Sequence, residues 1–230
     1  MAAGKLVFDA VGKHYYETGV DQTVLYPYDT TNGYKPGVAW DGVSAINENP
    51  DGAEPNDIYA DNIKYLSILS AESYGLTIEA YQSPVEFDAC DGAASVATGV
   101  VVRGQTRKMF GLSWRTKIGS DVNDDLGYKY HLAWGLKASP SDQNHETVND
   151  SPEASSLSWE AKSTPIKTNG FKPIAKMEID STTVDPDKLA SFLVMIYGQD
   201  ADSTAEPPVT ASEAYLPMPI DVINHFGISG

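Results

Sequence analysis

The stretch MFGLSWRTKIGSDVNDDLGYKYHLAWGLK, residues 109–137, contains two segments in which apolar and polar side chains alternate. Successive side chains on a β-strand point to opposite faces, so a period of two predicts half-buried strands. One face carries Phe110, Leu112, Trp114, Thr116 and Ile118 in the first segment, and Tyr130, Leu132, Trp134 and Leu136 in the second. The intervening DVNDDLG is rich in Asp, Asn and Gly, which tolerate left-handed backbone, and it predicts a tight turn between the strands.

The same alternation recurs along most of the chain. Further strands are expected at 37–46, 62–69, 74–82, 157–162 and 173–179, with short ones near Val7 and Leu25. Roughly eight strands separated by turn signals such as TNG and DGA predict a mainly β fold, a sandwich or a barrel. The candidate core residues of the strands are Phe110, Trp114, Trp134 and Trp159.

One segment follows a helical period instead. In DPDKLASFLVMIYG, the residues Leu189, Phe192, Leu193 and Ile196 follow i, i+3, i+4, i+7 spacing. Asp185 is suited to cap the first turn, Pro186 to the first helical position and Gly198 to the end. This predicts a helix at about 186–197 that packs on the sheet through core residues Leu189 and Phe192. A shorter helix is expected at 220–226, with Val222 and Phe226 facing inward.

These elements suggest one β domain over 1–198, a flexible linker over 199–214 and a C-terminal segment, 215–230, that packs back on the domain. Two polar stretches, 47–61 and 138–156, are expected to be long loops between strands. Loops of this length in compact domains are usually functional or disordered.

The charge balance limits the possible partners. The chain has 32 acidic and 16 basic residues, a formal net charge of −16, which disfavours general affinity for nucleic acid. No apolar run of membrane-spanning length and no signal-peptide pattern is present, so synthesis in the cytoplasm is expected. The stretch 103–117 is a basic island formed by Arg103, Arg107, Lys108, Arg115 and Lys117. It fits either a solvated strand face or a contact for an acidic segment of another copy.

Chemical motifs are mostly absent. The sequence lacks a nucleophile elbow, a phosphate-binding loop, a dinucleotide fingerprint and a zinc-protease motif. Cys90 is the single cysteine, and surface or strand-face roles are expected for the four histidines, His14, His131, His145 and His225. Residues 121–132 begin like a calcium loop, but position six is Leu126 and position twelve is Leu132, so a turn is favoured. The sequon Asn149–Ser151 is interpreted as chance. We therefore expect no enzyme, no cofactor and no metal.

Five blocks in order resemble the major tail proteins of long-tailed bacteriophages. They are YADNIKYL (59–66), RKMFGLSWRTKIGSDVNDDLGYKYHL (107–132), VNDSPEASSLSWEAKSTPI (148–166), the helix that ends in YG (197–198) and LPMPIDVINHF (216–226). The resemblance implies a β-sandwich or barrel with a flanking helix, similar to the inner-tube protein of type VI secretion systems. It also implies hexameric rings that stack into a tail tube, a virion location, and contacts with tape-measure, tail-tip and terminator proteins. DNA would pass through the lumen without specific binding, and no membrane partner is implied.

Under this hypothesis the two polar loops are assembly arms that reach the next ring. The candidate inter-subunit contacts are Glu48, Asp51, Glu54 and Asp57 on one copy, with Arg103, Arg107 and Lys108 on another. The alternative is a monomeric β-sandwich that binds a ligand such as carbohydrate, through exposed tyrosines at positions such as Tyr15, Tyr16, Tyr26 and Tyr28.

Overall fold

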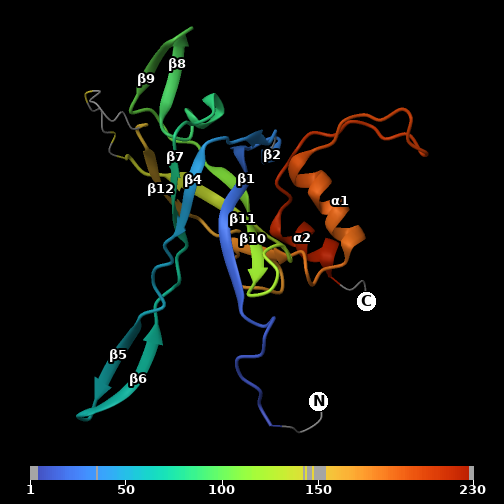
Figure 1. Ribbon diagram of the computed structural model, residues 1–230. Helices are drawn as coiled ribbons and strands as arrows, with labels where there is room; N and C mark the ends of the chain where they lie inside the picture. The colour runs from blue at the N-terminus through green and yellow to red at the C-terminus, as the bar shows by residue number, and fades with distance from the viewer. Residues whose placement is uncertain (1–4, 35, 142, 144–146, 148–153, 228–230) are drawn as a thin grey trace.

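A computed structural model describes residues 5–34, 36–141, 143, 147 and 154–227 (Figure 1). The fold is mainly β, with one large antiparallel sheet and two helices. Nine strands form that sheet, in the order β2-β1-β10-β11-β12-β7-β4, with β3 paired to β1 and β13 paired to β11. Their bounds are β1 Tyr15–Asp29, β2 Gly33–Tyr34, β3 Val38–Ala39, β4 Val43–Glu48, β7 Gly75–Ala80, β10 Phe110–Ser120, β11 Gly127–Ala138, β12 Leu157–Ser163 and β13 Lys176–Asp180.

Two further pairs of strands form separate two-stranded sheets. β5 (Pro55–Ala60) pairs with β6 (Ile63–Leu69), and β8 (Ala93–Ala97) pairs with β9 (Val100–Arg103). The helices are α1 (Pro186–Tyr197) and α2 (Pro219–Phe226), and a short 3-10 turn, η1, spans Val85–Phe87.

The sheet is built around the predicted β10–β11 hairpin. The two strands pair antiparallel from Phe110 opposite Leu136 to Ile118 opposite Gly127, and residues 121–126 form the turn. The strand expected near Val7 is wrong, because residues 5–14 have no strand pairing. The strand expected near Leu25 is part of the much longer β1.

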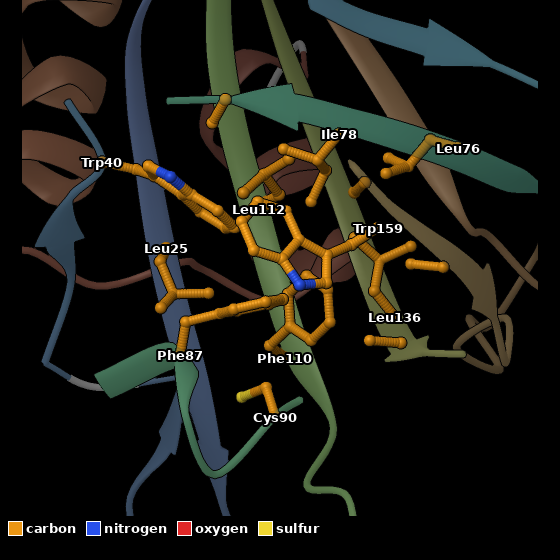
Figure 2. Close-up of a cluster of buried hydrophobic side chains, with 14 of the residues drawn as sticks. Leu25, Trp40, Leu76, Ile78, Phe87, Cys90, Phe110, Leu112, Leu136 and Trp159 are labelled. Atoms are coloured by element: carbon orange, nitrogen blue, oxygen red, sulfur yellow. The ribbon is translucent and has the colours of Figure 1, made fainter. Parts of the chain in front are cut away.

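The sheet curls until β4, at one end of the pairing order, lies against β1, the second strand from the other end. The side chains inside this curl form the inner cluster, shown in Figure 2. Its centre is aromatic: the ring of Phe87 lies 4.6 Å from Trp40, 5.3 Å from Trp159 and 5.4 Å from Phe110, centroid to centroid. Tilted and edge-on contacts of this kind add to the free energy that apolar burial supplies. The strands therefore enclose a core of their own.

A second, outer cluster lies on the opposite face of the sheet, under the helices. It includes Trp134, Phe192, Ile196, Leu216 and Val222, all of them buried. The indole nitrogen of Trp134 donates to the carbonyl of Pro217 at 2.9 Å, which fixes the C-terminal segment to the sheet. The segment 215–227 thus packs back on the domain.

Helix α1 has the bounds that its period predicted. The Asp185 side chain accepts hydrogen bonds from the backbone N–H groups of Asp187 and Lys188, and the helix ends at Gly198. Leu189 is half-buried against the outer cluster, whereas Phe192 is fully buried. The linker 199–214 has more pairing than its composition indicated, since isolated bridges join Gln199 to Ser212 and Asp202 to Val209.

The expectation that β11 presents one continuous apolar face is wrong at Gly135. This residue has φ +65°, and a Cβ there would lie 2.1 Å from the carbonyl oxygen of Thr164. The irregularity moves Leu136 to the inner cluster, while Leu132 and Trp134 belong to the outer one. The three tryptophans predicted for the core are consequently divided, with Trp114 and Trp159 inside the curl and Trp134 outside.

Candidate assembly surfaces

The stretch 47–61, expected to be a polar loop, is instead half of a projecting hairpin. Residues 55–60 are a strand, and β5 and β6 are joined by the two-residue turn Asp61–Asn62. Both turn residues have positive φ, 51° and 64°. A type I′ turn requires positive φ at both central positions, and its twist matches that of the two strands. Figure 1 shows this hairpin extending away from the body of the sheet.

Apolar side chains cover this β5–β6 hairpin and are exposed, with no covering element among the described residues. Seven of them are between 37% and 68% exposed: Ile58, Tyr59, Ile63, Tyr65, Leu66, Ile68 and Leu69. The register places Ile58 opposite Leu66 and Asn56 opposite Ile68, so Leu66 and Ile68 share one face while Tyr65 and Leu69 share the other. Both faces of the hairpin are therefore apolar and open to solvent.

Two other segments expose apolar groups in the same way. The β8–β9 hairpin, at the top of Figure 1, exposes Val96, Val100, Val101 and Val102. The N-terminal segment 5–14 exposes Leu6, Val7, Phe8 and Val11. This segment is tied to the β10–β11 turn because Asp121 accepts from the backbone N–H of Gly12 at 3.0 Å and lies 3.2 Å from the His14 ring. The hydrogen bond from Gly12, followed by that from His14, lowers the pKa of Asp121.

The four acidic residues proposed as contacts lie on or near the β5–β6 hairpin. Asp57 pairs with Lys64 across the hairpin at 2.8 Å, and Glu48 pairs with Lys176 on β13. Asp51 forms a backbone bridge with Ser73 at the base of the hairpin, and Glu54 is exposed. Two of the four carboxylates are thus already compensated within the chain.

The basic island is largely neutralised by intrachain partners as well. Arg103 lies 2.6 Å and Arg107 lies 3.9 Å from the same carboxylate, Asp91. Arg115 makes a bidentate pair with Asp21, and Lys117 lies 3.8 Å from Asp125. Lys108 is exposed, and no ion pair to it is found among the described residues. Of the three proposed basic contacts, Lys108 is the one most available to another molecule.

A polar cluster lies where the β5–β6 hairpin joins the body. The Lys176 ammonium lies within 2.6 Å of carboxylate oxygens of Glu48, the last residue of β4, and of Glu178. His131 on β11 is buried beside them, stacked on Trp114 at 5.0 Å with an angle of 4° between the rings. Its Nε2 lies 3.1 Å from Glu17 and 2.9 Å from the Thr116 hydroxyl, and its Nδ1 lies 3.7 Å from Glu178. Of the two roles expected for His131, the structure shows the strand-face one, since the residue lies on β11 and is buried rather than at the surface.

Burial and the positive charge of Lys176 lower the pKa of His131, which keeps the ring neutral at pH 7. Burial alone would raise the pKa of Glu17, but hydrogen bonds from Lys129 and Thr116 outweigh it, and the pKa is lowered. At Glu178 burial is again the largest single influence and would raise the pKa, but the hydrogen bond and positive charge of Lys176, together with the charge of Lys129, outweigh it, and the pKa is lowered. Both carboxyl groups are therefore ionised in this cluster.

The other histidines have different environments. His14 is exposed, and His225 lies half-buried with its Nε2 2.7 Å from the carbonyl of Lys188. His145, the sequon Asn149–Ser151 and most of the proposed arm 138–156 lie outside the described residues.

The tyrosines named for a ligand-binding module do not form one surface. Tyr26 is buried and donates to the carbonyl of Ile196, and Tyr28 is half-buried against the outer cluster. Tyr15 and Tyr16 line an open cavity of about 660 Å³ between the ends of β1, β10 and β13, together with Glu17 and Lys129. Two of the four tyrosines thus keep the alternative open.

Comparison with known proteins assigns the chain to no family. No family model matches the chain, and no curated protein matches it. Within the described residues, neither α1 nor α2 has the length and apolar character that a membrane-spanning helix requires.

Proposed function

We propose that this protein is a structural subunit of a phage tail tube, which forms hexameric rings that stack into a conduit for DNA. The observation that carries the proposal is the β5–β6 hairpin, an arm with exposed apolar side chains on both faces that no other described part of the chain covers. An isolated two-stranded hairpin is marginally stable in water, so such an arm gains most from a surface on another subunit.

The total surface supports an assembling subunit. The chain exposes 15126 Å², whereas a compact monomer of 24.8 kDa exposes about 10,000 Å². The excess is about 5,000 Å² on one chain, whereas obligate interfaces bury roughly 2,000–5,000 Å² counted over both partners, so the excess is large enough for more than one interface. Two projecting hairpins and the N-terminal segment expose apolar side chains. A tube subunit needs at least two different interfaces, one that closes the ring and one that propagates the stack.

The charge of the chain is compatible with a conduit. A basic lumen would bind the DNA phosphates and retain the duplex, whereas a net charge of −16 disfavours adhesion. Ion pairing of Arg103, Arg107 and Arg115 within the chain further reduces the positive charge available to phosphate.

Shortening the arm tests the proposal. Replacing residues 56–68 by Asn-Gly keeps Pro55 opposite Leu69 and closes the hairpin with a tight turn. We expect the variant to stay folded, because none of the removed side chains is in either core cluster, and to lose stacking in sedimentation and electron microscopy. Long tubes formed by this variant would contradict the proposal. The paired variants Tyr65→Ser/Leu69→Ser and Leu66→Ser/Ile68→Ser then identify which face makes the contact.

A monomeric ligand-binding module remains a second candidate, favoured by the cavity beside Tyr15 and Tyr16. Aromatic faces suit stacking on sugars. A glycan array separates the two functions: specific binding that Tyr16→Ala abolishes, together with a strictly monomeric protein, would favour the module.

A further inference from the structure

The polar cluster at the base of the β5–β6 hairpin has the composition of a cation site. Glu48, His131 and Glu178 come from three different strands, and each offers one ligand atom, with all three atoms within 4.8 Å of one another. Two carboxylates with one imidazole are a donor set suited to Zn²⁺ and related transition metals.

An independent observation points to a ligand. His131 is 3% exposed, and no hydrogen-bond partner for its Nδ1 is found in the part of the chain that the structure describes. A buried polar atom without a partner costs free energy, and native structures usually satisfy it with protein, water or an ion. Nδ1 faces the Glu178 carboxylate at 3.7 Å, too far for a hydrogen bond.

The other nitrogen of the ring is held as it is in metal sites. Nε2 lies 3.1 Å from the Glu17 carboxylate and 2.9 Å from the Thr116 hydroxyl. Because an ionised carboxylate can only accept a hydrogen bond, the tautomer with its proton on Nε2 fits this contact, and that tautomer has its lone pair on Nδ1. Metal-binding histidines almost always donate their second N–H to a carboxylate or carbonyl in this way. Stacking on Trp114 further fixes the plane of the ring.

We propose that Glu48, His131 and Glu178 form a Zn²⁺-binding site in which the Lys176 ammonium is the competing cation. The Lys176 ammonium contacts both carboxylates, so it occupies the position that the metal ion would take. Its flexible stem lets the ammonium leave, and rotation of the two glutamates brings the donors to the roughly 3.4 Å separation of tetrahedral zinc ligands. Glu48 ends β4, where the chain departs toward the hairpin, so the metal links the base of the arm to β11 and β13.

Titration calorimetry with zinc chloride on the full chain tests the site. We expect one Zn²⁺ per chain, affinity at least tenfold higher in Lys176→Met, and affinity at least tenfold lower in Glu178→Gln. Lys64→Met is the matched control, because it removes the same charge from a pair with Asp57 on the hairpin, and it should leave the affinity unchanged.

Two further measurements locate the metal. Cobalt(II) should broaden the NMR signals of His131 selectively, and His14→Ala should leave zinc binding unchanged because His14 lies on the N-terminal segment. Circular dichroism establishes that each variant is folded. Absence of binding in both wild type and Lys176→Met would overturn the proposal, and so would binding that His14→Ala abolishes or that Glu178→Gln leaves unchanged. All of these readouts use the unassembled protein, so failure here is distinguishable from failure of the tube proposal.

Discussion

The ammonium of Lys176 lies 2.6 Å from Oε2 of Glu48, and this contact ties the end of β4 to β13 at the point where the β5–β6 hairpin leaves the body. The same ammonium contacts Glu178, so one cation serves two carboxylates. The arm therefore has a defined attachment, although its apolar surface stays exposed in the part of the chain that the structure describes.

Removing this cation should loosen the base of the arm more than the fold. In metal-free buffer, Lys176→Met is expected to lower the free energy of unfolding by about 1 kcal/mol or less, because the pair is partly exposed. Hydrogen exchange should accelerate at the amides of Asn49 and Ser73, which donate across the base of the arm to the carbonyls of Gly75 and Asp51, respectively. Urea denaturation and exchange mass spectrometry measure the two effects. Unchanged exchange at both amides would show that the contact does not hold the arm.

Gly135 should be irreplaceable. Gly135→Ala is expected to cost more than about 2 kcal/mol of stability, because the residue has positive φ and its Cβ would collide with Thr164. Gly99→Ala is the matched control, with φ +76° and no atom within 4 Å of its Cβ, and it should cost only about 1 kcal/mol. Chemical denaturation gives both values, and equal losses would mean that the close approach to Thr164 is unimportant.

Acid should release the N-terminal segment from the β10–β11 turn. The pKa of Asp121 is lowered in the folded protein, first by the Gly12 hydrogen bond, so ionised Asp121 favours the attached state. Attachment is complete above the usual carboxyl pKa of about 4 and is lost as the pH falls through the lower, folded value. An NMR titration of the Gly12 amide should show this transition. In Asp121→Asn the transition should be missing, and its persistence there would assign it to another group.

Substitutions in the basic island should affect assembly and subunit stability differently. Lys108 is exposed, so Lys108→Glu should leave the unfolding free energy within about 0.5 kcal/mol and weaken assembly most at low salt. Arg107 is half-buried beside Asp91, so Arg107→Glu should lose roughly 2 kcal/mol in the subunit itself. Light scattering across a salt series and thermal melts test both variants. Equal assembly of wild type and Lys108→Glu at low salt would show that the basic island is a solvated strand face and not a contact between subunits.

Local patterns predicted the local elements well. Helix α1 could be bounded from Asp185, Pro186 and Gly198 because capping and helical period depend on neighbours in the sequence. The β10–β11 hairpin followed from alternation and its Asp-rich turn for the same reason.

An arm at 47–61 was expected, but the strand β5 within it was not, because the polar composition of this stretch is typical of a loop. The dipeptide Asp61–Asn62, between IYA and IKYLSIL, is a signal for a two-residue hairpin turn and could have identified β5. The irregularity at Gly135 could also have been predicted, since a glycine inside a strand pattern indicates a bulge that shifts the following side chains to the other face.

The polar cluster could not be predicted from spacing. Glu48, His131 and Glu178 are far apart in the chain, and the pairing of β13 with β11 and the curl of the sheet bring them together. Contacts of this kind depend on which strands pair in the folded chain, and the spacing of residues along the sequence does not contain that information.

Electron cryomicroscopy of the purified, concentrated protein, with and without a tail-tip complex to nucleate it, tests the central claim most directly. The account predicts stacked six-membered rings in which the exposed apolar residues of β5 and β6, Tyr65 and Leu66 among them, are buried against a neighbouring subunit. A protein that stays monomeric under every condition, or tubes in which the β5–β6 hairpin remains free in solvent, would contradict it.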